Sequence, residues 1–456
     1  MCRGMGELGE SSGLMEKTKV AIVGMGTVGT GVARLLLDHG DRTARHAGRT
    51  LWLQKAVVRD LAKRREIDLP QGVLTDCIEE VLGDPEIRVV AHLVGGLEPA
   101  RTIILRLLES GKDVVTANKA LLAEHGGELF DRARALGRSI AFEASVGGGV
   151  PIITNISQCF SANQILAIRG ILNGTSNFIV TQMDEGGMTY QEALEAAQRL
   201  GYAEADPTMD VDGSDAAQKL AILAHLAFGA RVHWRDIPRV GIEQLQARDL
   251  QYAAQLGYRV KLLASARWTD SGLELHVSPT LLKKGRPLAE VRGPYNGFAV
   301  VGDAVGDLFF HGQGAGQMPT ASAVVADMID TAVGRTGITF RTLELWSQRP
   351  AAVDLRAHED LLGRYYLRFQ VKDRPGVLGQ IASLLGKHGI SISSVIQEEH
   401  GSLNEPVQTV SLVIMTYDAS EGASRRAVEE IERLESIDGP CVRMRVAESL
   451  HKELAR

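Results

Sequence analysis

The sequence has little of what would suit it to a membrane, to nucleic acid or to an oxidising compartment. No apolar run approaches the roughly 20 residues that a transmembrane helix needs. The formal net charge of -6 leaves no basic surplus to hold a polyanion. The four cysteines are scattered, without the paired spacing of a disulfide framework or a zinc site, which is typical of a reducing compartment. These absences predict a soluble, cytoplasmic protein with neither a membrane nor a nucleic-acid partner.

The length of the chain sets the number of domains to expect. At 456 residues there is room for about three. Residues 1–14 contain acids, glycines and serines but no hydrophobic core of a signal peptide, so we expect a disordered extension there. Without a secretory signal, Asn173-Gly174-Thr175 is not expected to be a glycosylation site.

A glycine-rich turn near the N-terminus has the sequence Gly24-Met25-Gly26-Thr27-Val28-Gly29. It follows a short β-branched run, Lys19–Val23, and opens a helical pattern, Val28–Leu37. In such a turn the first glycine makes the bend, the second lets the backbone approach a pyrophosphate, and the third lets helix and strand pack closely. The pattern predicts dinucleotide binding by Gly24, Gly26, Thr27, Val28 and Gly29.

The end of the second predicted strand, Leu51–Val58, bears on the choice of cofactor. An acidic residue at this point holds the ribose hydroxyl of NAD, whereas an arginine accommodates the extra phosphate of NADP. Arg59, Asp60 and Lys63 supply both kinds of charge, and a solvated basic turn is the alternative. We favour NADP, with NAD also possible, and Arg59 as the best candidate to select it.

Strands and helices alternate through the first 150 residues. Further strands are predicted at Val89–Val94, Asp113–Thr116 and Ser139–Glu143, and helices at Pro99–Ser110 and Leu121–Leu136. This order predicts a doubly wound parallel sheet of the Rossmann type.

Two loops follow strands of that sheet at the edge where ligands bind in open α/β folds. Lys119, in the segment TANK, comes directly after one strand and is a candidate site residue, although a solvated lysine is the commoner outcome. The loop Glu143–Pro151 joins a carboxylate to glycine-rich backbone. It can offer carbonyl oxygens to a hard cation, and a plain flexible connection is the alternative.

The segment Gly201–Phe228 places charge on a helix that is otherwise apolar. From Ala216 to Phe228 only Gln218, Lys219 and His225 are polar, and a helix without a polar face is expected to be buried. Asp215, four residues before Lys219, shares its face. A buried ion pair is poor evidence for stability and better evidence for a site.

Six segments, taken in order, carry a family resemblance. They are GMGTVG, VVTANKALLA, FEASVGGGVPII, RGILNGTSNFI, GYAEADPTMDVDGSDAAQK and GQGAGQMPTASAVVADMI. Over roughly Lys17 to Glu344 the chain resembles the homoserine dehydrogenases, and the fourth and fifth segments together are highly distinctive of that family.

The resemblance implies roles for particular residues. Lys219 matches the catalytic lysine, and Glu204 and Asp215 match the acidic residues that hold the amino group of homoserine and order the site. Lys119 matches a second lysine at the substrate and nicotinamide. The implied catalytic set is Lys219, Lys119 and Asp215, and the implied substrate contacts are Glu204, Asp215 and Lys119. The implied sodium site comprises Glu143, Val146, Gly148 and Val150. Lys119 and Gly316 join the cofactor contacts, to which the charges after the second strand add Arg59 and Lys63.

The reaction implied by the resemblance is reversible hydride transfer between a nicotinamide and L-aspartate 4-semialdehyde, giving L-homoserine for threonine, methionine and isoleucine biosynthesis. The enzyme is then an oxidoreductase acting on CH–OH that uses NADP or NAD, with a sodium ion. We expect Lys219 to donate a proton in reduction and to accept it in oxidation. A dehydrogenase that forms an acyl phosphate needs a cysteine nucleophile, and Cys159 stands in an ordinary apolar stretch. A regulator that binds nucleotide and amino acid without turnover is the other alternative.

A second pattern follows an irregular stretch at Leu345–Asp360. Strands are predicted at Tyr365–Val371, Ile390–Gln397, Val407–Tyr417 and Cys441–Val446, and helices at Leu378–His388 and Ser424–Leu434. This β-α-β-β-α-β order, with the turn DRPGVL, resembles a ferredoxin-like ACT domain. The resemblance implies threonine feedback at Gly376–Leu378 and Gly389–Ser391, or else a domain retained for assembly.

The predicted organisation is an α/β chain with a Rossmann-type sheet, an α+β catalytic and dimerisation domain, and an ACT domain, assembled as a homodimer or homotetramer. The expected boundaries are 1–14 for the extension, 15–150 for the dinucleotide domain, 151–322 for the catalytic domain, 323–346 for a segment returning to the dinucleotide domain, 347–363 for a linker and 364–447 for the ACT domain.

Overall fold

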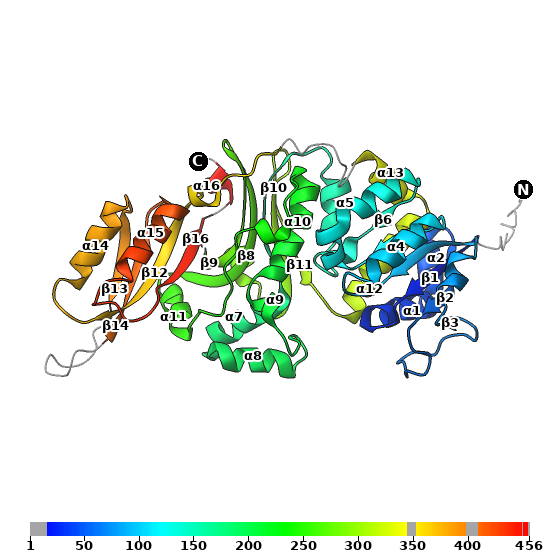
Figure 1. Ribbon diagram of the computed structural model, residues 1–456, viewed down its shortest axis with the longest axis horizontal. Coiled ribbons are helices and arrows are strands. Elements are labelled where there is room, and N and C mark those ends of the chain that lie inside the picture. The colour runs from blue at the N-terminus through cyan, green and yellow to red at the C-terminus, as the bar shows by residue number, and fades with distance from the viewer. Residues whose placement is uncertain (1–15, 344–352, 398–408, 449, 455–456) are drawn as a thin grey trace, which may run out of the picture.

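The computed structural model describes residues 16–343, 353–397, 409–448 and 450–454. The predicted extension at 1–14 and positions 347–352 of the predicted linker lie outside the described residues. Three bodies follow one another along the long axis in Figure 1: an N-terminal α/β body, a middle body and a C-terminal α+β body. No helix in the described ranges is long and apolar enough to cross a membrane.

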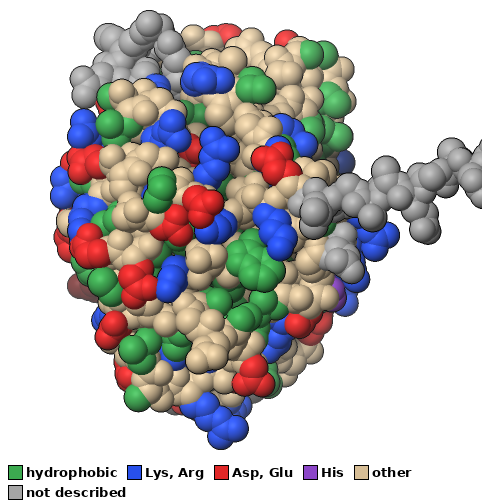
Figure 2. Space-filling view, turned by 90° about the vertical axis from the view of Figure 1, so that its right-hand side faces the viewer, with side chains coloured by type: hydrophobic (Ala, Val, Ile, Leu, Met, Phe, Trp, Pro, Cys, Tyr) green, Lys and Arg blue, Asp and Glu red, His purple; other side chains and the backbone are tan. Residues whose placement is uncertain are grey.

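The N-terminal body is built on a six-stranded parallel sheet with the order β3-β2-β1-β4-β5-β6. Its strands are β1 (Lys17–Val23), β2 (Thr50–Val57), β3 (Leu74–Thr75), β4 (Ile87–His92), β5 (Asp113–Thr116) and β6 (Ile140–Ala141). The helices α1 (Thr27–Asp38) and α12 (Gln317–Ala332) pack on one face, and α4 (Ala100–Glu109) and α5 (Lys119–Ala135) on the other. The predicted doubly wound sheet is confirmed. Seen end-on in Figure 2, this body carries interspersed acidic and basic side chains.

Burial on both faces explains the composition of the central strands. Val20, Ala21 and Ile22 of β1 are fully buried, as parallel sheets covered by helices require. The carboxyl ends of β1, β4 and β5 meet at one edge, because these strands are parallel neighbours. The turn at Gly24 and the TANK segment therefore face the same side of the sheet.

The middle and C-terminal bodies share a second sheet with the order β11-β10-β7-β8-β9-β16-β12-β14-β13, in which β15 also pairs with β12. Its strands are β7 (Ile165–Ile171), β8 (Tyr258–Thr269), β9 (Gly272–Lys283), β10 (Tyr295–Gly302), β11 (Gly306–Gln313), β12 (Leu362–Lys372), β13 (Ile392–Gln397), β14 (Thr409–Thr416), β15 (Ala419–Ser420) and β16 (Val442–Ala447). With α14 (Val377–Lys387) and α15 (Glu421–Ile431), the C-terminal body has the β-α-β-β-α-β order predicted for it.

The continuity of this sheet across the two bodies was not predicted. It depends on parallel pairing of β9 with β16, where Thr280–Leu282 lie opposite Arg445–Ala447. A buried ion pair reinforces the junction: Arg368 of β12 donates to Asp249 of α11, and both side chains are almost fully inaccessible. The C-terminal body is therefore joined to the middle body by a β-ladder and a buried charge pair.

The remaining α-helices belong to the middle body or lie in other parts of the chain. Those of the middle body are α7 (Gly174–Gly186), α8 (Tyr190–Arg199), α9 (Thr208–Val211), α10 (Ser214–Phe228) and α11 (Ala247–Gln255); the others are α2 (Gly40–Ala47), α3 (Glu79–Leu82), α6 (Ile152–Thr154), α13 (Arg335–Thr342) and α16 (Leu450–Leu454).

The chain returns to the N-terminal body earlier than the sequence suggested. The return was expected at residue 323, but α12 begins at Gln317. A Cβ at Gly31 of α1 would lie 2.9 Å from both the Gln317 carbonyl oxygen and the Ala321 Cβ, so the two helices touch from the first turn of α12. The glycines of the GQGAG segment directly precede this helix.

Two buried histidines predict how stability depends on pH. Burial lowers the pKa of His92 and of His225 from 6.5 to about 4. Unfolded histidines bind protons at a higher pH than these folded ones, so their contribution to stability is complete above pH 6.5 and is lost as the pH falls toward about 4. His92 alone accounts for roughly 3 kcal/mol across this window.

We therefore expect the free energy of unfolding of His92→Leu to fall less than that of the parent chain between about pH 7 and pH 5. Denaturant titrations at both pH values measure this difference. The exposed His46, changed to glutamine, is the matched control for the loss of a histidine. An identical pH dependence for His92→Leu and the parent chain would contradict the assignment.

Candidate active site

The predicted Asp215–Lys219 pair is formed on α10. This helix is buried along nearly its whole length, and Asp215 is only 5% exposed. The Lys219 Nζ donates to the Asp215 Oδ2 at 2.7 Å, across one helical turn. The apolar surroundings that the sequence indicated therefore enclose a charge pair.

The carbonyl at the end of β7 is a second acceptor for Lys219. The lysine Nζ donates to the Leu172 oxygen at 2.6 Å, and the Asn296 side-chain amide donates to the same oxygen at 3.0 Å. Asn296 is 1% exposed. Lys219 is thus held at two points, one on its own helix and one on the sheet of the middle body.

Lys119 approaches Asp215 from the N-terminal body. Its Nζ lies 3.1 Å from the Asp215 Oδ1, and its side chain keeps 37% exposure. Asn118 fixes the start of α5: its Oδ1 accepts from the Leu121 amide at 3.1 Å, and its Nδ2 donates to the carbonyls of Val94 and Gly96 at 3.1 and 2.7 Å. Asp215 therefore lies between two lysines that come from different bodies of the chain.

The charges of this cluster act on one another. Burial would raise the pKa of Asp215, but Lys219 and Lys119 hold the pKa of its carboxyl well below its usual range. The charge of Asp215 in turn raises the pKa of Lys119 against the effect of burial, helped by Asp210 and Glu204. Burial raises the pKa of Asp210, which Asn173 and the two lysines oppose. Asp215 is therefore ionised at neutral pH.

Asn173 is the residue of this cluster that sequence reasoning missed. Its Nδ2 donates to Asp215 Oδ2 at 2.9 Å and to Asp210 Oδ1 at 2.7 Å. Its Oδ1 accepts from the Ser176 amide at 2.7 Å and so caps α7. The sequence could have indicated Asn173 as the residue that caps a helix starting at Gly174. It could not have indicated which carboxylates the Asn173 side chain contacts.

The other acidic residues of the Gly201–Phe228 segment differ in their surroundings. Glu204 is exposed, and its charge contributes to the raised pKa of Lys119. Asp206 accepts from the Thr208 amide at 3.1 Å. Asp212 accepts from the Ser214 amide at 2.7 Å, next to the start of α10. Asp206 and Asp212 thus serve local turns.

The glycine turn after β1 has the geometry of a phosphate cradle. Gly24 has φ +102, and a Cβ at Gly29 would lie 2.0 Å from the Gly24 carbonyl oxygen, so both positions require glycine. Gly26 precedes α1, and no side chain caps the helix, whose first residues are Thr27 and Val28. The first amides of α1 are therefore available to an anionic ligand. These residues fit a dinucleotide pyrophosphate.

The candidates for cofactor selection lie at the end of β2. Arg59 and Lys63 are exposed. Asp60 accepts from the amides of Ala62 and Lys63 at 2.8 and 3.3 Å. One carboxylate oxygen of Asp60 is thus engaged within its own turn, while the two cations face solvent.

The GQGAG segment adjoins both the cofactor body and the Lys219 site. Gly316, at φ +125, precedes α12, whose N-terminus lacks a side-chain cap. A Cβ at Gly314 would lie 1.9 Å from Asn296 Oδ1, the side chain that holds the Leu172 carbonyl. The segment therefore packs on the residues that position Lys219.

The predicted sodium residues lie in one loop, but the Glu143 carboxylate is already occupied. It accepts from the amides of Ile153 at 2.9 Å and Thr154 at 2.7 Å, and from the Thr154 hydroxyl. Across the described part of the chain, no group of three or more histidine, cysteine, aspartate or glutamate side chains is arranged to hold a metal. A cation at this loop would therefore depend on the carbonyl oxygens of residues such as Val146, Gly148 and Val150.

These features define a class of protein. A doubly wound sheet with an open glycine turn, next to a buried lysine–carboxylate cluster, is a dinucleotide-dependent oxidoreductase, and here it carries an ACT domain.

Comparisons with known proteins agree and are more specific. Residues 24–143 match the model of the homoserine dehydrogenase NAD binding domain, 151–329 that of homoserine dehydrogenase, and 365–436 that of the ACT domain. Homoserine dehydrogenase of Pseudomonas aeruginosa is 43% identical over 438 residues, covering 95% of this chain and 99% of the relative. The chain belongs to the homoserine dehydrogenase family.

Solved structures give the same result. The crystal structure of a homoserine dehydrogenase from Thiobacillus denitrificans has a TM-score of 0.87 and 41% identity, covering 95% of this chain and 99% of that chain. A hyperthermophilic archaeal homoserine dehydrogenase mutant in complex with NADPH has a TM-score of 0.57 and 26% identity, covering 69% and 97%.

Proposed function

We propose that the chain interconverts L-aspartate 4-semialdehyde and L-homoserine with NADP, or with NAD, as part of threonine, methionine and isoleucine biosynthesis. The observation that carries the site assignment is the position of Asp215 between Lys219 and Lys119, at 2.7 and 3.1 Å. A carboxylate suits the ammonium group of homoserine, and a lysine suits its hydroxyl. Glu204, exposed beside the cluster, is the second carboxylate for the ammonium group.

In this mechanism the bound nicotinamide supplies the hydride chemistry. Lys219 donates a proton to the oxygen of the aldehyde as negative charge develops there, and takes it back in the reverse direction. Asp215 orients Lys219 and pairs with the substrate ammonium group. Lys119, which comes from the dinucleotide body, orients the reacting end of the substrate toward the cofactor.

The preference for NADP is supported by the turn after β2. One oxygen of Asp60, Oδ1, accepts from two backbone amides of its own turn, while Arg59 and Lys63 are exposed and cationic. An arginine at this point suits the 2′-phosphate of NADP.

Substitutions at two glycines of this turn distinguish an effect on folding from an effect on cofactor binding. Gly29→Ala forces a Cβ against the Gly24 carbonyl oxygen and is expected to lower stability by roughly 1–3 kcal/mol. A Cβ at Gly26 meets nothing within 4 Å, so Gly26→Ala should fold normally. Its methyl group enters the space assigned to the pyrophosphate, and we expect the cofactor KM to rise roughly tenfold, about 1.4 kcal/mol.

Thermal unfolding and cofactor titration of both variants measure these effects. A folded Gly26→Ala variant with an unchanged cofactor KM would contradict the placement of the pyrophosphate.

The proposal also includes a sodium site, feedback by threonine and an oligomeric state. We propose that the loop of Glu143, Val146, Gly148 and Val150 binds sodium through carbonyl oxygens, with Glu143 holding α6. We propose threonine feedback at the ACT turns Gly376–Leu378 and Gly389–Ser391, and a homodimer or homotetramer.

One assay tests these points together. Homoserine oxidation is measured with NADP and with NAD, in sodium or choline chloride, with and without threonine. We expect a higher kcat/KM with NADP, activation by sodium and inhibition by threonine. The absence of homoserine oxidation with either cofactor would overturn the proposed reaction. Equal rates in choline chloride would reject the sodium site, and no threonine effect on activity or thermal stability would favour a domain retained for assembly.

A further inference from the structure

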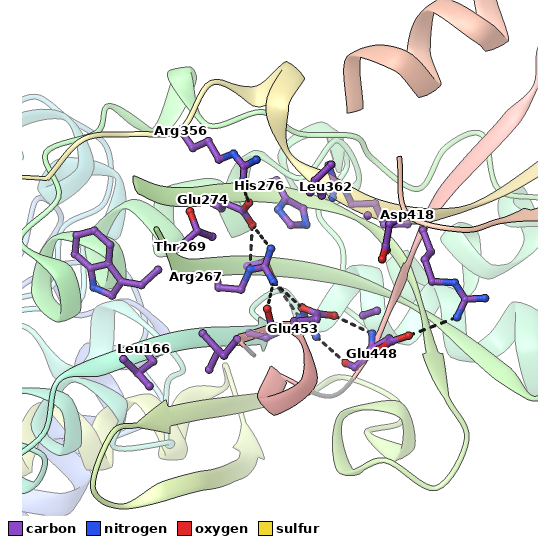
Figure 3. A pocket seen from close by; sticks show the side chains of 18 of the residues that line it. Leu166, Arg267, Thr269, Glu274, His276, Arg356, Leu362, Asp418, Glu448 and Glu453 are labelled. Atoms are coloured by element: carbon purple, nitrogen blue, oxygen red, sulfur yellow. Dashed lines mark hydrogen bonds and ion pairs between the residues drawn. The ribbon is translucent and has the colours of Figure 1, made fainter. Parts of the chain in front are cut away.

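Two joints connect the three bodies of the chain, and the one between the middle and C-terminal bodies is a continuous sheet. Beside the pairing of β9 with β16 lies a cavity of about 590 Å³, lined by five arginines and five carboxylates (Figure 3). Arg267 donates to the Glu274 carboxylate at 2.6 and 3.0 Å, and Arg356 donates to its other oxygen at 2.8 Å. A β-ladder and balanced ion pairs therefore hold this joint.

The joint between the N-terminal and middle bodies is built differently. In the part of the chain that the structure describes, these two bodies share no strand. Instead, helix α5 of the N-terminal body packs against α10 of the middle body. Lys119, the first residue of α5, lies 3.1 Å from Asp215 on α10. The distance from Lys119 to Asp215 therefore depends on where α5 lies relative to the middle body.

Glu124 makes a second contact between α5 and the middle body. Its Oε1 accepts from the Trp234 Nε1 at 2.8 Å and lies 3.2 Å from Arg235, while its Oε2 lies 3.1 Å from His233 Nε2. All three partners lie in or next to the 3₁₀ helix η3 (Trp234–Asp236), which follows α10. Burial would raise the pKa of the Glu124 carboxyl, but Trp234, His233 and Arg235 hold that pKa below its usual range. Glu124 is therefore an ionised acceptor for three side chains of the other body.

Close packing does not fix α5 on the side that carries Glu124. A cavity of about 790 Å³ lies there, lined by α5 on one side and by α10 and the segment before η3 on the other. Across such a space the close contacts that hold packed helices together are missing. The Glu124 side chain, only 16% exposed, reaches Trp234, which is 8% exposed. The polar contacts of Glu124 therefore connect the two bodies where the apolar packing is interrupted.

We propose that Glu124 is a positioning residue, which holds α5 against η3 and thereby places Lys119 at Asp215. Glu124 and Lys119 are five residues apart, about 7.5 Å along one helix, so fixing one fixes the other. The inference rests on the proposed dehydrogenase function, in which the cofactor lies on the N-terminal body and the substrate on the middle body. A misplacement of about 1 Å between reacting groups can cost about 100-fold in rate.

Glu124→Ala and Glu128→Ala are matched variants of the same helix. Glu128 also lines the cavity, but its carboxylate accepts from Arg101 at 2.6 Å, within the N-terminal body. We expect Glu124→Ala to lower the single-turnover rate of hydride transfer by about 10- to 100-fold while the cofactor KM stays within about twofold of the parent value. Glu128→Ala should change neither. A parent-like rate in folded Glu124→Ala, or an equal loss in Glu128→Ala, would overturn the proposal.

A double-mutant cycle with Trp234→Phe distinguishes positioning through this contact from general destabilisation. Phenylalanine keeps an aromatic ring but removes the N–H that Glu124 accepts, so it breaks the same hydrogen bond from the other body. We expect Trp234→Phe to lower the hydride-transfer rate about fivefold in the parent chain and very little in Glu124→Ala. Effects of the two substitutions that simply add would contradict the proposal.

Two native cysteines allow a measurement that needs no turnover. Cys77 in the N-terminal body and Cys159 in the middle body are exposed, whereas Cys441 is buried. With Cys2 changed to serine, nitroxide labels on Cys77 and Cys159 report the distance between the two bodies by double electron–electron resonance. An excess of unlabelled chain restricts the measured distances to those within one chain.

We expect the distance distribution to be broader in Glu124→Ala and in Trp234→Phe than in the parent chain, and unchanged in Glu128→Ala. An unchanged distribution in Glu124→Ala would overturn the proposal even if the parent chain oxidises homoserine. No homoserine oxidation by the parent chain would instead overturn the proposed function, and with it the role of Glu124 in that reaction.

Discussion

Replacement of Lys219 by alanine is expected to lower the turnover number for homoserine oxidation by about 100- to 10,000-fold, the usual contribution of one general acid or base. Lys219 is held by Asp215 at 2.7 Å and by the Leu172 carbonyl at 2.6 Å, so its ammonium group has a fixed position. Alanine leaves that position empty, and the proton of the substrate hydroxyl has no acceptor. The KM for the cofactor should change little, because the glycine turn after β1 is in another body of the chain.

Lys112→Ala is the matched control for this prediction. Lys112 is also a buried lysine, 2% exposed, but it donates to the Asp84 carbonyl within the N-terminal body. Its loss should lower thermal stability and leave the turnover number close to that of the parent chain. Full turnover in a folded Lys219→Ala variant would show that Lys219 is not the proton-transfer group.

Replacement of Asp215 by asparagine should lower both activity and stability. The carboxylate is 5% exposed and pairs with Lys219 and Lys119, and removal of one partner of a buried pair typically costs about 3–5 kcal/mol. The two lysines would then repel each other across a neutral amide. We expect kcat/KM for homoserine to fall at least about 100-fold, about 2.7 kcal/mol, with a higher KM because the substrate ammonium group loses its partner.

Steady-state kinetics and denaturant unfolding separate these effects. Asp212→Asn is the control, since Asp212 accepts from Ser214 next to the same helix and touches neither lysine in the described contacts. An Asp215→Asn variant with normal KM and kcat for homoserine would reject Asp215 as a substrate ligand.

The sequence predicted the parts of this fold that local patterns determine. The glycine turn, the alternating strands of the N-terminal body and the order of the C-terminal body follow from hydrophobic periodicity and turn residues. The Asp215–Lys219 pair could also be predicted, because a spacing of four residues fixes two side chains on one helical face.

Contacts between distant segments could not be predicted in this way. Asn173 contacts Asp215, 42 residues away in the sequence, and Asn296 contacts Leu172, 124 residues away. No local sequence pattern predicts contacts over such separations. The pairing of β9 with β16 joins two domains that the pattern shows as separate units. The periodicity of a segment predicts that it is a strand, but it does not predict which strand it pairs with. The continuous sheet therefore follows only from the three-dimensional structure.

The central claim, that Lys219 transfers the proton, is tested most directly by chemical rescue of Lys219→Ala. Hydride transfer is measured in single turnovers with homoserine and NADP while a small primary amine is added. We predict that the amine restores the rate in proportion to its concentration in Lys219→Ala but not in Asp215→Asn, because only the former lacks an amine. A rate in Lys219→Ala that equals the parent rate without added amine would contradict the account.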